Sequence, residues 1–125
     1  MIKKYAATVI EIDDIVEEFV VLLINNVEVR CFISYCPHRI RIGEQHSVEL
    51  EIVLPDENYA ETSKEKRMGV ETIDDSFSCI LYGYLNGSIL ESFVSFYEQE
   101  IHYEHPHLNE RYVKIIVERI NVFFE

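Results

Sequence analysis

The fold is decided by residues 19–35, which read FVVLLINNVEVRCFISY. Two apolar runs flank Asn25-Asn26, and paired asparagines adopt the positive φ angles of a type I′ turn at low cost. A two-residue turn pairs Ile24 with Val27, and the ladder then gathers apolar side chains on one face. We therefore predict a β-hairpin. Because its second face is only partly polar, that face should be covered, or the hairpin should lie inside the sheet.

Alternation of apolar and polar residues continues outside this hairpin, as is typical of strands with one buried face. It extends over Lys3–Ile12, His46–Leu54 and Tyr112–Phe124. In the last of these segments the inward-facing set changes phase around Glu118-Arg119, which predicts a β-bulge.

A second hairpin is predicted across Asn86-Gly87, because this dipeptide joins two further alternating runs, Phe77–Leu85 and Ser88–Phe96. Between the strands, residues 56–75 are polar and charged. They are expected to form a long mobile loop or, over Tyr59–Met68, a short helix. Residues 97–110 are irregular and acidic, and we expect a loop there as well.

About seven strands, two tight hairpins and one insertion predict a mainly β fold, a single antiparallel β-barrel or sandwich. An OB-like barrel is the favoured form, with a possible short helix in the 56–75 insertion. The length of 125 residues suits one domain spanning 1–125. The expected core includes the inward-facing residues Val48, Leu50, Ile52, Val113, Ile115 and Val117.

The charge balance limits the partners. The chain has 23 acidic and 11 basic residues, a formal net charge of −12, so its field repels phosphate backbones and attracts basic molecules. We expect no binding to nucleic acid. The longest apolar run, Phe19–Ile24, is far shorter than the roughly 20 residues of a membrane span. The N-terminal residues lead into a strand and not into a signal-peptide core, so we expect a cytoplasmic protein with no membrane contact.

Catalytic motifs are missing from the sequence: there is no phosphate-binding loop, nucleophile elbow or zinc-protease pattern. We therefore expect no enzyme and no cofactor. The cysteines are odd in number and lack metal-site spacing, and Cys31 and Cys79 are expected to be small core residues. Cys36-Pro37-His38 is the one place where the sequence brings a thiol and an imidazole near enough for a reactive pair, and no third group to orient them is evident.

Three histidines, His102, His105 and His107, lie together with two glutamates within residues 100–107. Such groups can ligate Zn²⁺ or Ni²⁺, but a strand-like His-x-His pair needs further ligands from a neighbouring strand. An exposed polar loop is the favoured interpretation and no metal site is predicted. Whether these side chains hold a metal stays open.

The acids are distributed unevenly. Between Met68 and Glu110 there is no Lys or Arg, while glutamates and aspartates accumulate. Concentrating like charge destabilises the compact state, which favours a use for it, such as binding a basic protein. The expected partner-binding residues combine aromatic area with acid, and they are Tyr97, Glu98, Glu100, Tyr103 and Glu104. Second choices, equally suited to a turn, are Asp13 and Asp14.

In size, acidity, expected location and lack of catalytic motifs, the chain resembles bacterial immunity proteins, which neutralise a co-encoded and often basic nuclease toxin. This resemblance implies a non-catalytic protein that blocks a basic toxin domain. The alternating segments Val48–Ile52 and Tyr112–Val117 look like an OB-type barrel. The alternatives are therefore an OB-like ligand-binding protein, a phage-type inhibitor or DNA mimic, or a His-rich metal-binding protein.

Overall fold

Regular structure in residues 3–125, which the computed structural model describes, is almost entirely β. Within that range there are eleven strands, one α-helix and one 3₁₀ helix. The strands up to the insertion are β1 (Tyr5–Ile12), β2 (Phe19–Ile24), β3 (Val27–Tyr35) and β4 (Gln45–Val53). The later elements are β5 (Ala60–Thr62), β6 (Gly69–Thr72), β7 (Cys79–Asn86), β8 (Ile89–Glu91), β9 (Ser95–Tyr97), α1 (Gln99–Glu104), η1 (Pro106–Leu108), β10 (Tyr112–Val117) and β11 (Arg119–Phe124).

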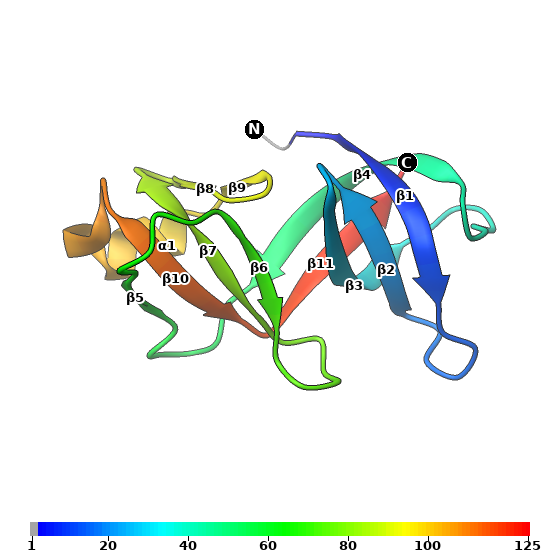
Figure 1. The fold of residues 1–125 in the computed structure, drawn as a ribbon, viewed down its shortest axis with the longest axis horizontal. Coiled ribbons are helices and arrows are strands. Elements are labelled where there is room, and N and C mark those ends of the chain that lie inside the picture. Colours follow the sequence, from blue (N-terminus) through cyan, green and yellow to red (C-terminus); the bar gives the residue numbers. More distant parts are fainter. Residues whose placement is uncertain (1–2) are drawn as a thin grey trace.

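The strands form two sheets, which lie side by side in Figure 1. In sheet A, five strands pair in a closed ring in the order β1-β2-β3-β11-β4, and β4 pairs with β1. The pairing of β11 with β3 is parallel, and the others in the ring are antiparallel. The ring is irregular, because its register shifts between Val9 and Glu11 and between Val122 and Phe123.

Sheet B is formed by the chain between β4 and β11. Its order is β5-β10-β7-β8-β9, and β6 also pairs with β7. The mainly β class is therefore confirmed. The expected number of about seven strands is wrong, because eleven strands form in residues 3–125 and divide between two sheets. The OB-like form stays a prediction.

The first hairpin confirms the prediction made from its turn. Asn25 and Asn26 have φ angles of 51° and 65°, and Ile24 pairs with Val27 as expected. Its second face is covered, because Phe77 from the β6–β7 loop packs on Phe19 and Phe32, with ring centroids 5.8 and 5.5 Å away. A distant loop thus covers the apolar side chains that the hairpin alone leaves bare.

The second hairpin forms, but its register differs from the expected one. Asn86 remains in β7 and pairs with Ile89, so the turn residues are Gly87, with φ 61°, and Ser88. In this register Leu85 lies opposite Leu90, and both side chains are fully buried. The burial of two leucines outweighs the turn preference of Asn86-Gly87.

The phase change near Glu118 marks a passage between the two sheets and not a bulge within one strand. β10 belongs to sheet B and β11 to sheet A, and Glu118 between them donates its backbone N–H to the Val53 carbonyl at 2.8 Å. The side chains on either side of the break enter the core from different sheets. Those fully buried are Val113, Ile115, Val117, Ile120 and Val122.

Two segments expected to be loops contain regular structure. Residues 56–75 include β5 and β6, and Tyr59–Met68 is not helical. Each of these strands is too short to show an alternating pattern of its own and forms by pairing with β10 or β7. Residues 97–110 contain α1 and η1, which are anchored by the buried side chains of Ile101 and Leu108.

The core runs through both sheets as one buried apolar cluster. Of the expected core residues, Val48 and Ile52 are buried with the three from β10, whereas Leu50 is only half-buried. Cys31 and Cys79 are buried core residues as expected, and burial raises the pKa of both thiols. No helix in residues 3–125 is long and apolar enough to cross a membrane.

Candidate functional site

Helix α1 begins among the acids that the sequence singled out. Glu98 is its N-cap residue, and the Glu98 carboxylate accepts a hydrogen bond from the backbone N–H of Glu100 at 3.2 Å. Desolvation raises the pKa of the Glu98 carboxyl, and this hydrogen bond offsets only part of the effect. Glu98 therefore has a structural role, since it satisfies a free N–H at the start of the helix.

Tyr59, which precedes β5, joins the helix to the rest of sheet B. Its side chain is buried, and its hydroxyl donates a hydrogen bond to Oε1 of Glu104. Burial is the main cause that raises the pKa of the Tyr59 phenol, and the charges of Glu104, Glu100 and Glu98 raise it further. Of the three predicted glutamates, Glu104 contacts the phenol directly, and the charges of Glu100 and Glu98 also act on it. The phenol stays protonated at neutral pH.

The two tyrosines among the predicted partner-binding residues are exposed to solvent. Tyr103 in α1 is 87% exposed, and Tyr97 at the end of β9 is 51% exposed. The Tyr97 hydroxyl accepts a hydrogen bond from Nε2 of Gln99 at 2.8 Å, which holds the ring near the start of α1. We call Tyr97, Glu98, Glu100, Tyr103 and Glu104 the α1 surface. Within it Glu98 and Glu104 also support the fold, whereas the side chains of Glu100 and Tyr103 point to solvent.

Asp13 and Asp14 do not belong to this surface. They lie in the loop between β1 and β2, at the opposite end of the molecule from α1 (Figure 1). Oδ1 of Asp13 accepts the backbone N–H groups of Ile15 and Val16 at 2.7 and 2.8 Å, and these bonds lower the pKa of the Asp13 carboxyl. Asp13 is thus a turn residue, and the exposed Asp14 adds charge beside it.

Two of the three histidines in residues 97–110 make contacts between aromatic rings. The His105 ring meets the Tyr59 ring edge-on at a centroid distance of 5.1 Å, and His107 lies 5.9 Å from His105. Nδ1 of His102 is buried without a hydrogen-bond partner. No cluster of three or more His, Cys, Asp or Glu side chains in residues 3–125 has an arrangement that would hold a metal ion.

Cys36 and His38 are not arranged as a nucleophile and a base. The Cys36 thiol donates to the backbone carbonyl of His38 at 2.9 Å, and Nε2 of His38 lies 2.9 Å from the backbone carbonyl oxygen of Glu125. The imidazole stacks on His46 with a centroid distance of 5.1 Å. The ring is therefore engaged with the C-terminal residue and not with the thiol.

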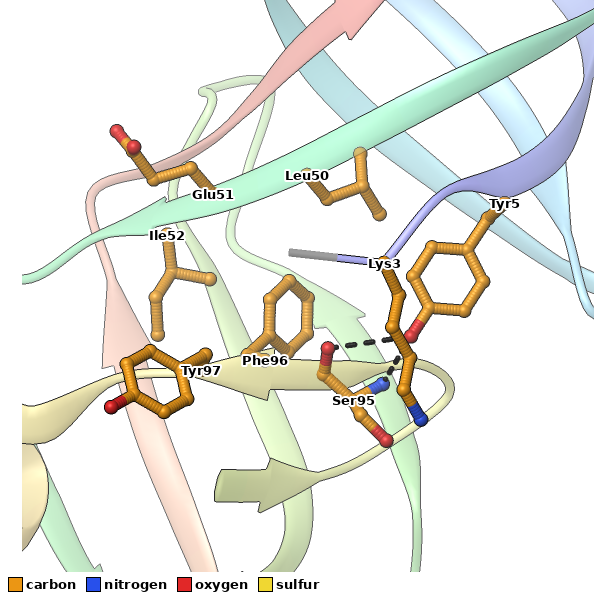
Figure 2. A pocket seen from close by; sticks show the side chains of 8 residues that line it. All are labelled: Lys3, Tyr5, Leu50, Glu51, Ile52, Ser95, Phe96 and Tyr97. Atoms are coloured by element: carbon orange, nitrogen blue, oxygen red, sulfur yellow. Dashed lines mark hydrogen bonds between the residues drawn. The ribbon is translucent and has the colours of Figure 1, made fainter. Parts of the chain in front are cut away.

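A small pocket lies where β4 of sheet A meets β9 of sheet B (Figure 2). Its free volume is about 120 Å³, well below the roughly 300 Å³ at which pockets for small molecules begin. Ser95 closes one side, because its backbone N–H donates to the Tyr5 hydroxyl at 3.0 Å. The geometry suits a junction between sheets better than a site for a substrate.

The outward-facing side of sheet B is a surface that the sequence pattern revealed only in part. Tyr82 and Tyr84 of β7 and Tyr112 of β10 point away from the core and remain half-exposed. Tyr82 and Tyr84 alternate with buried residues in the run Phe77–Leu85, so the sequence pattern alone indicates that they share one face. Tyr112 carried no such signal, because only the long-range pairing of β10 with β7 places it beside Tyr84.

Known proteins give little further information. No curated protein and no solved structure matches the sequence. A family model described as "Uncharacterised conserved protein UCP019853" matches residues 3–125. Since the match extends over nearly the whole sequence, the chain belongs to this uncharacterised conserved family.

Proposed function

We propose that this protein is a non-catalytic, cytoplasmic acidic protein that binds a basic protein partner and blocks the partner's active surface. The observation that carries the proposal is the α1 surface, where Glu98 at the N-cap and Glu100 and Glu104 within one six-residue helix lie next in sequence to the exposed Tyr97 and Tyr103. Carboxylates beside exposed aromatic rings suit an interface with a cationic protein.

Charge and aromatic area have different effects in such an interface. A net charge of −12 speeds the encounter with a basic partner, and salt screens this effect. The strength of the complex depends on a few desolvated anchors, for which aromatic residues are favoured. Tyr103 and Tyr97, the most exposed aromatic side chains of the α1 surface, are the anchors we propose.

The most plausible partner is a nuclease-type toxin domain, which makes this chain an immunity protein. Support comes from its size and its acidity. The gene context tests this identity, because an immunity protein is expected beside the gene of its toxin. If the adjacent upstream gene encodes no basic protein that binds this chain, the toxin assignment is wrong.

A second candidate is an OB-like ligand-binding protein, which the strand order β1-β2-β3-β11-β4 of sheet A supports. OB domains that bind single strands combine a basic groove with stacking rings, whereas this chain is strongly acidic. Fluorescence anisotropy with labelled single- and double-stranded oligonucleotides at physiological salt separates the two candidates. We expect no measurable binding, and micromolar affinity would favour the OB-like candidate.

The decisive experiment measures binding kinetics with the purified product of the adjacent upstream gene. We choose the double variant Glu100→Lys, Tyr103→Ala, because neither side chain supports the fold. The expected result is slower association and faster dissociation with an unchanged melting temperature. Glu28→Lys, an exposed charge reversal in sheet A, is the control for net charge. If the double variant and Glu28→Lys bind the partner with the same kinetics, the α1 surface is not the binding site.

A further inference from the structure

The outward-facing side of sheet B carries a continuous band of aromatic and aliphatic side chains. Alternation along β7 and β10 buries one set of residues and leaves the other half-exposed or exposed. Helix α1 contributes Ile101 to the buried cluster, and the residues of the other set keep partial or full exposure. We call this band the outer face of sheet B, and its members are Ile80, Tyr82, Tyr84, Tyr112, Lys114 and Ile116.

One part of this face already holds a guanidinium group from the chain itself. The Arg67 Cζ lies 4.1 Å from the centroid of the Tyr82 ring. Nη1 of Arg67 is 3.5 Å from Oε2 of Glu71, and the Tyr82 hydroxyl donates to the same oxygen at 3.3 Å. A tyrosine ring beside a carboxylate is thus shown to accept an arginine here, by stacking and by charge.

The neighbouring part of the face has the same kinds of group but no arginine. Tyr84 and Tyr112 pack edge-on, with ring centroids 5.2 Å apart. Across the sheet, Tyr112 pairs with Tyr84, and Tyr84 pairs with Glu91 of β8, so the two rings and the carboxylate lie in one row. Directly opposite residues in a sheet have Cβ atoms about 5 Å apart, which is close enough for one guanidinium to contact the ring and the carboxylate together.

The cations nearest in sequence are engaged elsewhere. Lys114 pairs with Glu61 at 3.0 Å, and Nε of Arg111 donates to the His107 carbonyl at 3.2 Å. Among residues 3–125, no Lys or Arg lies over the Tyr84 or Tyr112 ring, and Glu91 makes no ion pair. The second tyrosine–carboxylate row is therefore open to a cation from another molecule.

We infer that the outer face of sheet B binds an arginine-bearing segment of a basic protein, with one guanidinium placed against the Tyr84–Tyr112 ring pair, stacked on one of the two rings and paired with Glu91. The exposed Ile116 and Ile89, 42% and 37% exposed, add apolar area for the rest of the segment. Arginine is favoured over lysine because its planar group stacks on a ring while it donates hydrogen bonds to a carboxylate. The inference shares the partner class of the proposed function but places binding on a different surface.

The test uses two peptides with alternating glycines, one containing three arginines and the other three lysines, titrated into the ¹⁵N-labelled protein. We expect chemical-shift changes centred on Tyr84, Glu91 and Tyr112. The affinity for the arginine peptide should be about 2–5 times that for the lysine peptide, because only a planar guanidinium stacks on a ring while it donates hydrogen bonds to Glu91. Equal affinities, or changes elsewhere only, would overturn the inference.

Variants separate this surface from the α1 surface. Tyr84→Leu and Tyr112→Leu keep apolar bulk in the strands and remove the stacking ring, so each should weaken arginine-peptide binding by about 2–5 times. Tyr103→Ala in α1 should leave that affinity unchanged. If the peptide shifts α1 signals alone and only Tyr103→Ala weakens it, the outer face is excluded and the proposed function stands. If the product of the adjacent upstream gene does not bind, but the arginine peptide binds at Tyr84, Glu91 and Tyr112 as expected, the proposed function is wrong and the inference about the outer face of sheet B stands.

Discussion

The outer faces of the two sheets carry similar groups, but only one is covered. On sheet A, the Phe19 and Phe32 rings lie under Phe77, and the Arg119 Cζ lies 4.1 Å from the Phe32 centroid. On sheet B, the three tyrosines are half-exposed like these phenylalanines, but no ring from a distant loop packs on them, and Arg67 lies over one ring of three. Phenylalanine is apolar throughout and is favoured where it stays covered. Tyrosine combines an apolar ring with a hydroxyl that hydrogen-bonds to water, so it suits a surface that is exposed in the free protein and covered when a partner binds.

This contrast assigns different roles to the two faces. The β6–β7 loop is held over sheet A by Phe77 and by Arg30, whose Nη1 donates to the Asp74 carbonyl at 2.8 Å. That face contributes to stability. Sheet B has its core on one side and an uncovered aromatic side on the other, as an interaction surface requires.

The largest expected effect tests which side of β10 is the core. Ile115 is fully buried, and its neighbour Ile116 is 42% exposed on the outer face of sheet B. Ile115→Ala should cost about 2–5 kcal/mol of unfolding free energy, because it removes buried methyl groups and leaves a cavity. Ile116→Ala should cost no more than about 0.5 kcal/mol. Urea unfolding of both variants measures the difference, and similar losses would mean that the outer face is covered in solution.

A smaller loss of stability is expected when Gly83 is replaced, because β8 approaches β7 closely at this residue. A Cβ atom at this position would lie 2.4 Å from the backbone oxygen of Glu91, which cannot move without breaking the β7–β8 pairing. Gly83→Ala should therefore destabilise the protein by about 1–3 kcal/mol. Gly69→Ala is the matched control, since nothing lies within 4 Å of its added Cβ. Equal melting temperatures for the two variants would contradict the close approach.

The first hairpin was predictable because its information is local. Asn25-Asn26 fixes the turn, and long alternating strands fix the register, so the pairing of Ile24 with Val27 follows from adjacent residues. β5 and β6 have only three and four residues and form by pairing with strands distant in sequence. The division into two sheets escaped prediction for the same reason, because it depends on long-range pairing.

The sequence identified residues of the candidate site but not the structural role of each side chain. The sequence identified Glu98, Glu100 and Glu104 as a group, and the structure places them at the N-cap of α1 and within this helix, where Glu104 bonds Tyr59. That Glu98 caps a helix and Glu104 accepts a phenol hydrogen bond depends on a six-residue helix too short to show a period. The row of Tyr84, Tyr112 and Glu91 depends on pairing across three strands, which no local pattern encodes.

An intermediate effect is expected from uncovering sheet A. Phe77→Ala removes the ring that packs on Phe19 and Phe32. We expect the free energy of unfolding to fall by about 0.5–1.5 kcal/mol for each of the two lost aromatic contacts. Binding of the arginine peptide should be unchanged. Unfolding measurements and the peptide titration test both halves of this expectation. Weaker peptide binding by the Phe77 variant would show that the two outer faces are not independent.

The smallest expected effect concerns Glu98, whose carboxyl pKa is raised in the folded protein mainly by desolvation. The unfolded chain has the ordinary carboxyl pKa, about 4.3. Between that value and the raised pKa, the folded state binds more protons than the unfolded state, so stability falls as the pH rises through this interval. At neutral pH the cost of keeping the carboxylate partly buried is fully present. Glu98→Gln removes that charge and keeps an oxygen to accept the N–H of Glu100.

We therefore expect Glu98→Gln to be slightly more stable than the parent protein at neutral pH, with the difference vanishing as the pH falls below about 4. Glu28→Gln, at an exposed position in β3, controls for the general benefit of removing one negative charge from a chain of net charge −12. Thermal unfolding between about pH 3.5 and pH 8 gives the comparison, with the pH range set by the ordinary carboxyl pKa. A Glu98 variant that is less stable at neutral pH would show that the charge at the start of α1 stabilises the helix by more than its desolvation costs. In that case Glu98 would contribute to the fold as a charged cap, and the acid available to a partner on the α1 surface would be Glu100.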